Sequence, residues 1–349
     1  MIKSNTRSQG FSKPLGSKEK NILTDTFGRK HNYLRISLTE RCNLRCTYCM
    51  PAEGIQLSPK EHIMTYEEIY TIAQEFVNLG VTKIRLTGGE PLVRKDAANI
   101  IEKLASLPVE LTLTTNGVIV DKFIDLFKKC GINNLNVSLD SLSPQKNKEI
   151  TRRSYFDKVY NNILLLVKEG FNVKINCVLM KGFNDDETID FIKLGKELPV
   201  HIRFIEFMPF DGNRWNMDKM VSLQEILSEV NTAFTKNEIV KLEDAPNDTT
   251  KSYQIQGYQG TFAIISSVTN PFCDGCNRIR LTANGQIKNC LFSSTESDLL
   301  TPLREGKPIT PIIEKSVQKK FKVRSGMDTL DKFKDIDGHN NRSMITIGG

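Results

Sequence analysis

Short strand-like segments alternate with helix-like segments over the first two thirds of the chain, and this alternation limits the fold more than any other feature. Strands separated by helices of this length form βαβ units with parallel pairing. About six units are present rather than eight, which predicts an incomplete barrel of parallel strands, with an open doubly wound sheet as the alternative. The predicted strands span 31–38, 83–86, 110–114, 134–139, 172–179 and 201–207, and the helices between them span 66–79, 99–107, 121–130, 155–169 and 187–197.

The pattern changes after a last helix-like stretch at 222–230. Residues 243–251 are polar and rich in turn formers, as in a linker or a long loop. Beyond them the sequence predicts short strands at 253–255, 260–266, 278–281 and 286–290, followed by a basic, mostly polar tail. We therefore expect an α/β barrel over residues 25–242 and a smaller C-terminal module over residues 243–349.

Residues 1–24 are expected to form an extension outside the barrel. Residues 1–20 carry five basic side chains and one acid, Glu19, without the apolar core of a secretory signal. This composition fits a mobile tail or an organellar transit peptide, so the chain is expected in the cytoplasm or the mitochondrial matrix and not outside the cell. The longest apolar run, Ile163 to Val167, is far short of the ~20 residues that cross a bilayer, so no membrane span is expected.

The formal net charge is +7, from 48 Lys and Arg residues against 41 Asp and Glu residues. This moderate excess suits an anionic ligand, and it equally suits a solvated basic surface. The basic residues form no stripe interleaved with aromatic side chains, so a nucleic-acid-binding protein is not expected.

Eight cysteines are present, but the length of the chain and the absence of a secretory signal disfavour a disulfide framework. Cys42, Cys46 and Cys49 follow the first predicted strand with the spacing CxxxCxxC. Three thiolates can hold a zinc ion that has a further ligand, or a 4Fe–4S cluster whose fourth iron stays open. Cys130 ends a predicted helix and Cys177 lies in an apolar strand, so both are expected to pack in the core.

A second set, Cys273, Cys276 and Cys290, has the spacing CxxC-x13-C. It again fits either a zinc knuckle or a 4Fe–4S cluster with one open iron. Arg278 and Arg280 alternate on a predicted strand between these cysteines and so share one face. Two guanidinium groups on one face suit a polyphosphate, although a solvated edge strand would carry the same pattern.

The first cysteine set, with Tyr48 before its last cysteine, resembles the signature of radical S-adenosylmethionine (SAM) enzymes. Gly88-Gly89-Glu90, after the second predicted strand, resembles the "GGE" motif of the same superfamily. The resemblance implies that SAM binds the open iron of a 4Fe–4S cluster and that electron transfer releases a 5′-deoxyadenosyl radical. It further implies that SAM is contacted by Tyr48, Gly89, Ser138 and Met208.

Both cysteine sets together resemble the GTP 3′,8-cyclase family of molybdenum cofactor biosynthesis (the MoaA family). The likeness covers about residues 25–349, including Phe27-Gly28-Arg29, Arg203–Pro209 and Asn277–Leu281. It implies that a second 4Fe–4S cluster binds the guanine of GTP and that a double-glycine tail, Gly348-Gly349, reaches the active site and assists catalysis. It also implies that GTP is contacted by Arg35, Arg85, Thr114, Lys174, Arg278 and Arg280. Each of these residues falls in or at the end of a predicted strand, so we expect them to gather at the barrel mouth.

The same resemblance implies the reaction and its partners. The radical removes the ribose 3′ hydrogen of GTP, the sugar radical attacks carbon 8 of guanine, and one electron and one proton complete 3′,8-cyclo-7,8-dihydro-GTP. An electron donor, a homodimer and a functional link to the cyclic pyranopterin monophosphate synthase that takes the product are expected. Two alternatives are another radical SAM enzyme with an auxiliary cluster, such as a peptide maturase, and a zinc-stabilised binding module.

Overall fold

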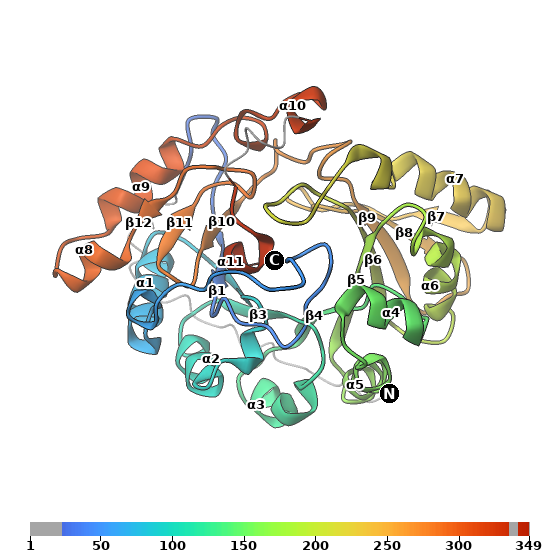
Figure 1. Cartoon of the computed structure of the whole chain (residues 1–349), viewed down its shortest axis with the longest axis horizontal. Helices are drawn as coiled ribbons and strands as arrows, with labels where there is room; N and C mark the ends of the chain where they lie inside the picture. Colours follow the sequence, from blue (N-terminus) through green and yellow to red (C-terminus); the bar gives the residue numbers. More distant parts are fainter. Residues whose placement is uncertain (1–22, 335–340, 349) are drawn as a thin grey trace, which may run out of the picture.

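The predicted parallel strands form one curved sheet in the computed structural model, which describes residues 23–334 and 341–348 (Figure 1). The first six strands pair in parallel and in chain order, which confirms the incomplete barrel and excludes the doubly wound alternative. They are β1 (Tyr33–Ser37), β2 (Lys83–Thr87), β3 (Glu110–Thr115), β4 (Asn134–Ser138), β5 (Asn172–Leu179) and β6 (His201–Glu206).

Amphipathic helices cover the outer face of the curved sheet (Figure 1). The first of them buries Ile69, Ile72 and Phe76 at helical spacing, and a capping box between Thr65 and Glu68 fixes its start. The helices are α1 (Tyr66–Asn78), α2 (Ala97–Ala105), α3 (Ile124–Lys129), α4 (Pro144–Thr151), α5 (Phe156–Lys168), α6 (Thr188–Leu194) and α7 (Leu223–Ala233). Short 3-10 turns lie at Lys60–His62, Pro91–Val93, Val120–Phe123, Asp185–Glu187, Met217–Lys219 and Arg324–Gly326.

Helix α4 is absent from the sequence-based prediction. Its eight residues are mostly polar and Ile150 is its only large apolar side chain, so it shows no helical periodicity. The local signals at its start are Ser143, whose side chain accepts from the Lys146 N–H, and Pro144 in the first turn.

The C-terminal strands extend both edges of this sheet. β7 (Ile239–Lys241), β8 (Lys251–Ile255) and β9 (Thr261–Ile265) lie beyond β6, and β9 pairs with β6 in parallel. At the other edge β10 (Arg278–Leu281) pairs with β1 in parallel, followed by β11 (Gln286–Lys288) and β12 (Ser297–Asp298). A domain boundary at residue 243 stays a prediction, because strands on both sides of it belong to one sheet.

The segment after residue 299, predicted as a polar tail, contains further helices. They are α8 (Leu300–Arg304), α9 (Thr310–Gln318), α10 (Asp331–Lys334) and α11 (Met344–Ile347). In α9, Ile313 and Val317 are buried four residues apart, a short amphipathic pattern within a charged stretch. Helix α11 lies on the inner side of the curved sheet (Figure 1).

Residues 1–22 of the predicted extension lie outside the described part, whereas Leu23 is buried and Thr24 bridges to Lys30. Within the described ranges, no helix combines the length and the apolar character needed to cross a membrane.

Strand residues alternate between an apolar outer face and a polar inner face. Leu34 and Ile36 of β1 are fully buried, as are Ile84 and Leu86 of β2, and they belong to the main hydrophobic core. The residue between Leu34 and Ile36 is Arg35, which points the other way and lines an internal cavity. The core therefore lies outside the barrel wall, and the interior is left for polar side chains.

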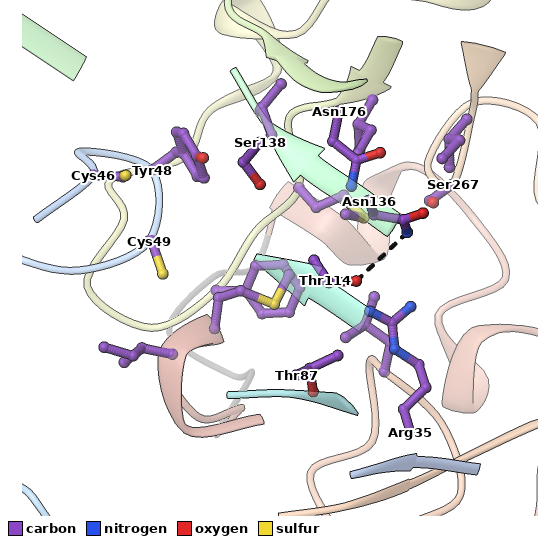
Figure 2. A pocket seen from close by; sticks show the side chains of 18 of the residues that line it. Arg35, Cys46, Tyr48, Cys49, Thr87, Thr114, Asn136, Ser138, Asn176 and Ser267 are labelled. Carbon is purple, nitrogen blue, oxygen red and sulfur yellow. Dashed lines mark hydrogen bonds between the residues drawn. The ribbon is translucent and has the colours of Figure 1, made fainter. Parts of the chain in front are cut away.

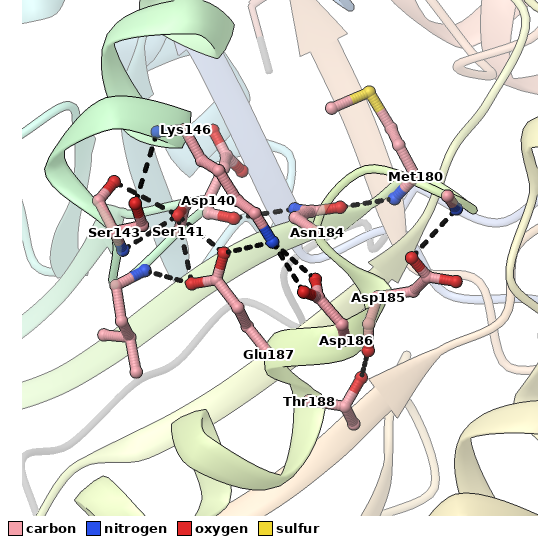
Figure 3. A network of polar contacts seen from close by, with 12 residues as sticks. Asp140, Ser141, Ser143, Lys146, Met180, Asn184, Asp185, Asp186, Glu187 and Thr188 are labelled. Carbon is pink, nitrogen blue, oxygen red and sulfur yellow. Dashed lines mark hydrogen bonds and ion pairs between the residues drawn. The ribbon is translucent and has the colours of Figure 1, made fainter.

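A buried polar network joins the loop after β4 to the loop after β5 (Figure 3). The Asn184 amide donates to the Asp140 carbonyl at 2.6 Å and to the Val178 carbonyl at 3.0 Å, and it accepts from the Met180 N–H at 2.8 Å. Glu187 accepts from the Ser141 hydroxyl at 2.8 Å. These bonds fix two strand ends that border the cavity.

Replacing Asn184 by alanine is expected to lower the free energy of unfolding by about 2–4 kcal/mol, because two buried carbonyls and one N–H lose their partner. Urea denaturation monitored by circular dichroism measures the difference. The matched control is Asn161→Ala, an exposed asparagine on α5, which should change stability by less than about 0.5 kcal/mol. Equal unfolding midpoints for the two variants would contradict the structural role of this network.

Candidate active site

The two cysteine sets lie at opposite ends of one cavity. Cys42, Cys46 and Cys49 follow β1 and so stand at the carboxyl ends of the parallel strands. Cys273 and Cys276 precede β10, which runs parallel to β1, and therefore stand at the amino ends. Cys290 follows the antiparallel β11 and returns to that same end. All six cysteines line the cavity.

The GGE segment packs against the loop that carries the first cysteine set. The Gly89 N–H donates to the Thr39 carbonyl at 2.7 Å, and the Glu90 N–H donates to the Arg41 carbonyl at 2.8 Å. A Cβ atom at Gly89 would lie 2.3 Å from the Arg41 carbonyl oxygen, so only glycine fits here. The absence of a side chain at Gly89 therefore lets this turn pack directly against the backbone of the cysteine loop.

The first cysteine set is electrostatically unfavourable for free thiolates. Burial raises the pKa of Cys42 to about 11 and that of Cys49 to about 12, and it raises the pKa of Cys46 well above its ordinary value. The charge of Asp140 raises the pKa of Cys46 and Cys49 further. These sulfurs hold protons at neutral pH until a metal centre displaces them.

The second cysteine set lies beside basic groups. Burial opposes ionisation of Cys276, but the charges of Arg278 and Lys320 lower its pKa to about 6. Backbone N–H groups point at all three sulfurs, from Arg324 to Cys273, from Arg278 to Cys276 and from Phe292 to Cys290. The charged groups near the cysteines are thus negative at one end of the cavity and positive at the other.

The donor chemistry of both sets fits an iron–sulfur cluster better than a zinc ion. In the described part of the chain, no three His, Cys, Asp or Glu side chains are arranged to hold a single metal ion, and no histidine lines the cavity. The thiolates of a 4Fe–4S cluster each bind a different iron, so they need not converge on one point. N–H donors to the sulfurs are the usual outer support of such ligands.

The four residues predicted to contact SAM all line the cavity. Figure 2 shows Tyr48 and Ser138 at the end of the cavity near Cys46 and Cys49. The Tyr48 hydroxyl donates to an Asp140 carboxylate oxygen at 2.9 Å. The Asn213 amide donates to the Tyr48 carbonyl at 3.2 Å and the Met208 carbonyl at 2.8 Å, which joins two of the four. The sequence-based prediction did not include Asp140 and Asn213. The position of Asp140, two residues after Ser138 at the end of a strand, was a signal that could have identified it.

The residues predicted to contact GTP lie deeper than the barrel mouth where they were expected. Arg35, Thr114, Arg278 and Arg280 line the cavity along its walls, between the cysteine sets. Arg85 is outside the lining residues and donates to the Leu113 carbonyl at 3.1 Å and the Thr114 hydroxyl at 3.5 Å. Lys174 is also outside them, on β5. The difference arises because Arg35 and Arg85 occupy the middle of their strands rather than the ends.

Positive charges crowd the interior of the barrel. Burial and the neighbouring charge of Arg85 lower the pKa of Arg35 to about 10 and that of Arg203 to about 9. Burial and the charge of Arg203 also lower the pKa of Lys174. Such mutual repulsion in a buried place indicates an anionic ligand.

Arg203 was not among the predicted site residues, although the predicted strand 201–207 contains it. Its position between the outward-facing Ile202 and Phe204, which are fully buried, marks it as inward-facing. Buried polar atoms without a hydrogen-bond partner occur on five cavity residues, at Nε of Arg35, Arg203 and Arg324 and at Oδ1 of Asn136 and Asn176. Unpaired buried polar atoms call for a polar ligand or ordered water.

The C-terminal segment lies between the two ends of the cavity. The Gly348 carbonyl accepts from Arg280 Nη1 at 2.6 Å, and the Ser343 hydroxyl donates to the Cys49 carbonyl at 2.8 Å. Gly348 has a φ of 84°, and a Cβ atom there would lie 2.5 Å from the Thr87 hydroxyl, so glycine is required. Gly349 lies outside the described residues.

Of the remaining cysteines, Cys177 is fully buried and belongs to the core, and Cys130 is half-buried against it, as predicted.

Two family profiles together match most of the chain. Residues 36–195 match the Radical SAM superfamily, and residues 200–326 match the family described as Molybdenum Cofactor Synthesis C. Among solved structures, SuiB from Streptococcus suis bound to S-adenosylmethionine is similar, with a TM-score of 0.59 and 17% identity over 85% of this chain and 69% of that chain. At this identity the likeness shows the fold alone.

Sequence relatives are much closer. The mitochondrial GTP 3′,8-cyclase of Arabidopsis thaliana is 47% identical over 94% of this chain and 84% of its own length. The GTP 3′,8-cyclase of Desulforamulus reducens is 41% identical over 85% of this chain and 94% of its own length. Human molybdenum cofactor biosynthesis protein 1 is 45% identical over 93% of this chain, which spans only 51% of the human protein.

Glu90 should make stability depend on pH. Burial raises its pKa to about 7, from an ordinary value of 4.5, despite bonds from Thr115, Asn116 and Leu92. The folded protein therefore binds the proton more tightly than the unfolded chain. This contribution is fully present below about pH 4.5 and is lost as the pH rises through about 7.

Glu90→Gln should flatten this dependence, reducing the loss of stability between about pH 4.5 and 7 by up to about 3 kcal/mol. Thermal unfolding of the anaerobic protein across that range gives the slope. The variant should be less stable than the parent at low pH, because its amide cannot accept all three bonds. Glu102→Gln, an exposed carboxylate on α2, is the control and should keep the parental slope.

Proposed function

The chain belongs to the GTP 3′,8-cyclase family of radical SAM enzymes, and on that premise we propose that it cyclises GTP to (8S)-3′,8-cyclo-7,8-dihydroguanosine 5′-triphosphate. This reaction is the first step of molybdenum cofactor biosynthesis. The zinc-stabilised binding module considered from the sequence is wrong, because the family is one of enzymes.

The observation that carries the proposal is a cationic cavity with three thiols at each end. Arg35, Arg203, Arg278 and Arg280 line it, and Arg85 and Lys174 add positive charge from just behind the lining. A nucleoside triphosphate brings several negative charges and bidentate acceptors for guanidinium groups. A peptide maturase would not need this density of buried cations.

At the first end, membership of the superfamily implies a 4Fe–4S cluster and SAM, and the residues present fit them. Cys42, Cys46 and Cys49 would ligate three irons and leave the fourth for SAM. Bound together, cluster and SAM supply the carbon-centred radical that abstracts hydrogen. Tyr48, Gly89, Ser138 and Met208 would hold SAM in place, with Tyr48 fixed by its hydrogen bond to Asp140.

At the second end, Cys273, Cys276 and Cys290 would ligate a second 4Fe–4S cluster whose open iron receives the guanine base. The arginines between the two ends would then hold the triphosphate, and Thr114 would contact the ribose or a phosphate. Held at both ends, GTP presents its ribose toward SAM. The enclosing barrel keeps water from the radical, and positioning supplies the main catalytic advantage.

The Gly348-Gly349 tail is proposed to assist turnover, since Gly348 already contacts Arg280. An external electron donor, a homodimer and transfer of the product to the cyclic pyranopterin monophosphate synthase complete the proposal. A location in the mitochondrial matrix is favoured by the mitochondrial relative from Arabidopsis.

The reaction is tested by incubating the reconstituted protein anaerobically with GTP, SAM and dithionite. 5′-Deoxyadenosine and the cyclised nucleotide should appear together and only when GTP is present. Deoxyadenosine without a nucleotide product would contradict GTP as the substrate.

Cys276→Ala should lower the iron content from about eight to about four per chain and abolish nucleotide cyclisation, because the second cluster loses a ligand. Iron and sulfide analysis after anaerobic reconstitution measures the cluster content of the variant. Cys130→Ala is the control, a cysteine outside both sets, and should keep the parental iron content. If both variants hold the same iron, the second cluster proposal fails.

Arg278→Ala should weaken GTP binding about 10- to 100-fold, the usual effect of losing a charged hydrogen bond, while the iron content stays unchanged. Equilibrium dialysis of GTP against the reconstituted variant measures the affinity. Arg153→Ala, an exposed arginine outside the cavity, should bind GTP as the parent does. Unaltered affinity in Arg278→Ala would remove this residue from the site.

A further inference from the structure

The segment from Lys319 to Arg324 passes behind the second cysteine set and points donors at it. Lys320 Nζ lies 3.4 Å from the Cys276 sulfur and 2.9 Å from the Arg278 carbonyl. The backbone N–H of Arg324 points at the Cys273 sulfur. Sequence analysis assigned this segment to a polar tail, and the proposed function gives it no role.

Lys320 is an unusual lysine because it is buried without a carboxylate partner. It is 5% exposed, and among the ion pairs of the described residues none includes it. The carboxylate of Asp25, nearby in the same network, bonds instead to Arg29 and His31. A buried ammonium group needs a compensating anion, and of the two acceptors that Lys320 Nζ contacts, the Cys276 sulfur is the one that can carry negative charge.

The backbone of Arg324 is held in a strained conformation that aims its N–H group. Arg324 and Ser325 have φ values of 38° and 58°, two consecutive non-glycine residues in the left-handed region. The Arg324 guanidinium donates to the Val268 and Asp328 carbonyls and lies 4.8 Å from the Phe333 ring centre. Successive N–H groups in such a turn form a concave donor surface typical of iron–sulfur and anion sites.

Arg29 ties this segment to the cysteine loop from the other side. Its guanidinium donates to the Cys273 carbonyl at 2.9 Å, the Lys322 carbonyl at 2.8 Å and the Phe321 carbonyl at 2.8 Å. Asp25 orients it through Nε at 2.6 Å. Hydrogen bonds of Arg29 therefore join the cysteine loop and the 319–324 segment to the residues that precede β1.

We propose that Lys320 is a positioning group for the second cluster and that its charge sets the reduction potential of that cluster. This inference rests on the proposed second cluster. Reduction adds negative charge to the cluster, and a positive charge at a ligand sulfur favours that state, so Lys320 raises the potential. The charge of Asp140, which faces Cys46 and Cys49 of the first set, acts in the opposite direction, so the two clusters are held at different potentials.

The test compares Lys320→Met, Lys320→Arg and the adjacent exposed Lys319→Met. Each is made in a full-length chain whose Cys42, Cys46 and Cys49 are alanine, so that the second cluster gives the only signal. Iron content and an electron paramagnetic resonance redox titration are measured. Lys320→Met should shift the midpoint to lower potential, while Lys320→Arg and Lys319→Met stay near the parent.

If Lys320→Met and the parent have the same iron content and the same midpoint reduction potential, the inference is overturned and the proposed function stays intact. If Lys320→Met loses its iron, the inference requires that Lys320→Arg keeps the parental iron content and the parental midpoint potential. A change in either quantity in Lys320→Arg also overturns the inference. A parent chain without iron in this background instead refutes the second cluster itself.

Discussion

The parallel pairing of β10 with β1 is the interaction on which the site depends. It aligns Arg278 with Tyr33 and Arg280 with Arg35, and it joins segments 245 residues apart at Asn32 and Asn277. Because β10 runs parallel to β1, the cysteines before β10 lie at the opposite end from the cysteines after β1. An antiparallel pairing would place all six at one end and leave no span for a substrate between them.

The two ends of the cavity differ electrostatically, and the difference matches what each is proposed to hold. The charge of Asp140 faces Cys46 and Cys49 of the first set, whereas Lys320 and Arg278 place positive charge beside Cys276 of the second. SAM carries a sulfonium cation, and GTP carries a polyanion. The electrostatic potential therefore favours the cationic ligand at one end of the barrel and the anionic ligand at the other.

Sequence reasoning predicted much of the fold, and most of the residues that it assigned to the site line one cavity. The six parallel strands were predicted within one or two residues at most ends, because outward-facing residues such as Ile84 and Leu86 keep a regular apolar pattern. Helix α4 was not predicted, because its mostly polar residues show no helical hydrophobic pattern. Asn213 was not predicted, because a side-chain amide that donates to two backbone carbonyls produces no recognisable pattern in the sequence.

By itself, the sequence determined the parallel α/β class and the two cysteine triplets, since these depend on local spacing and local hydrophobic pattern, and the family followed from the resemblance of its motifs. Only the tertiary structure decided that the triplets face each other along the barrel axis and that Arg203 joins the cations between them. It alone placed Lys320 behind Cys276. The reason is that spacing along the chain specifies neighbours within a loop or strand, whereas parallel pairing and strand direction decide which distant loops share an end.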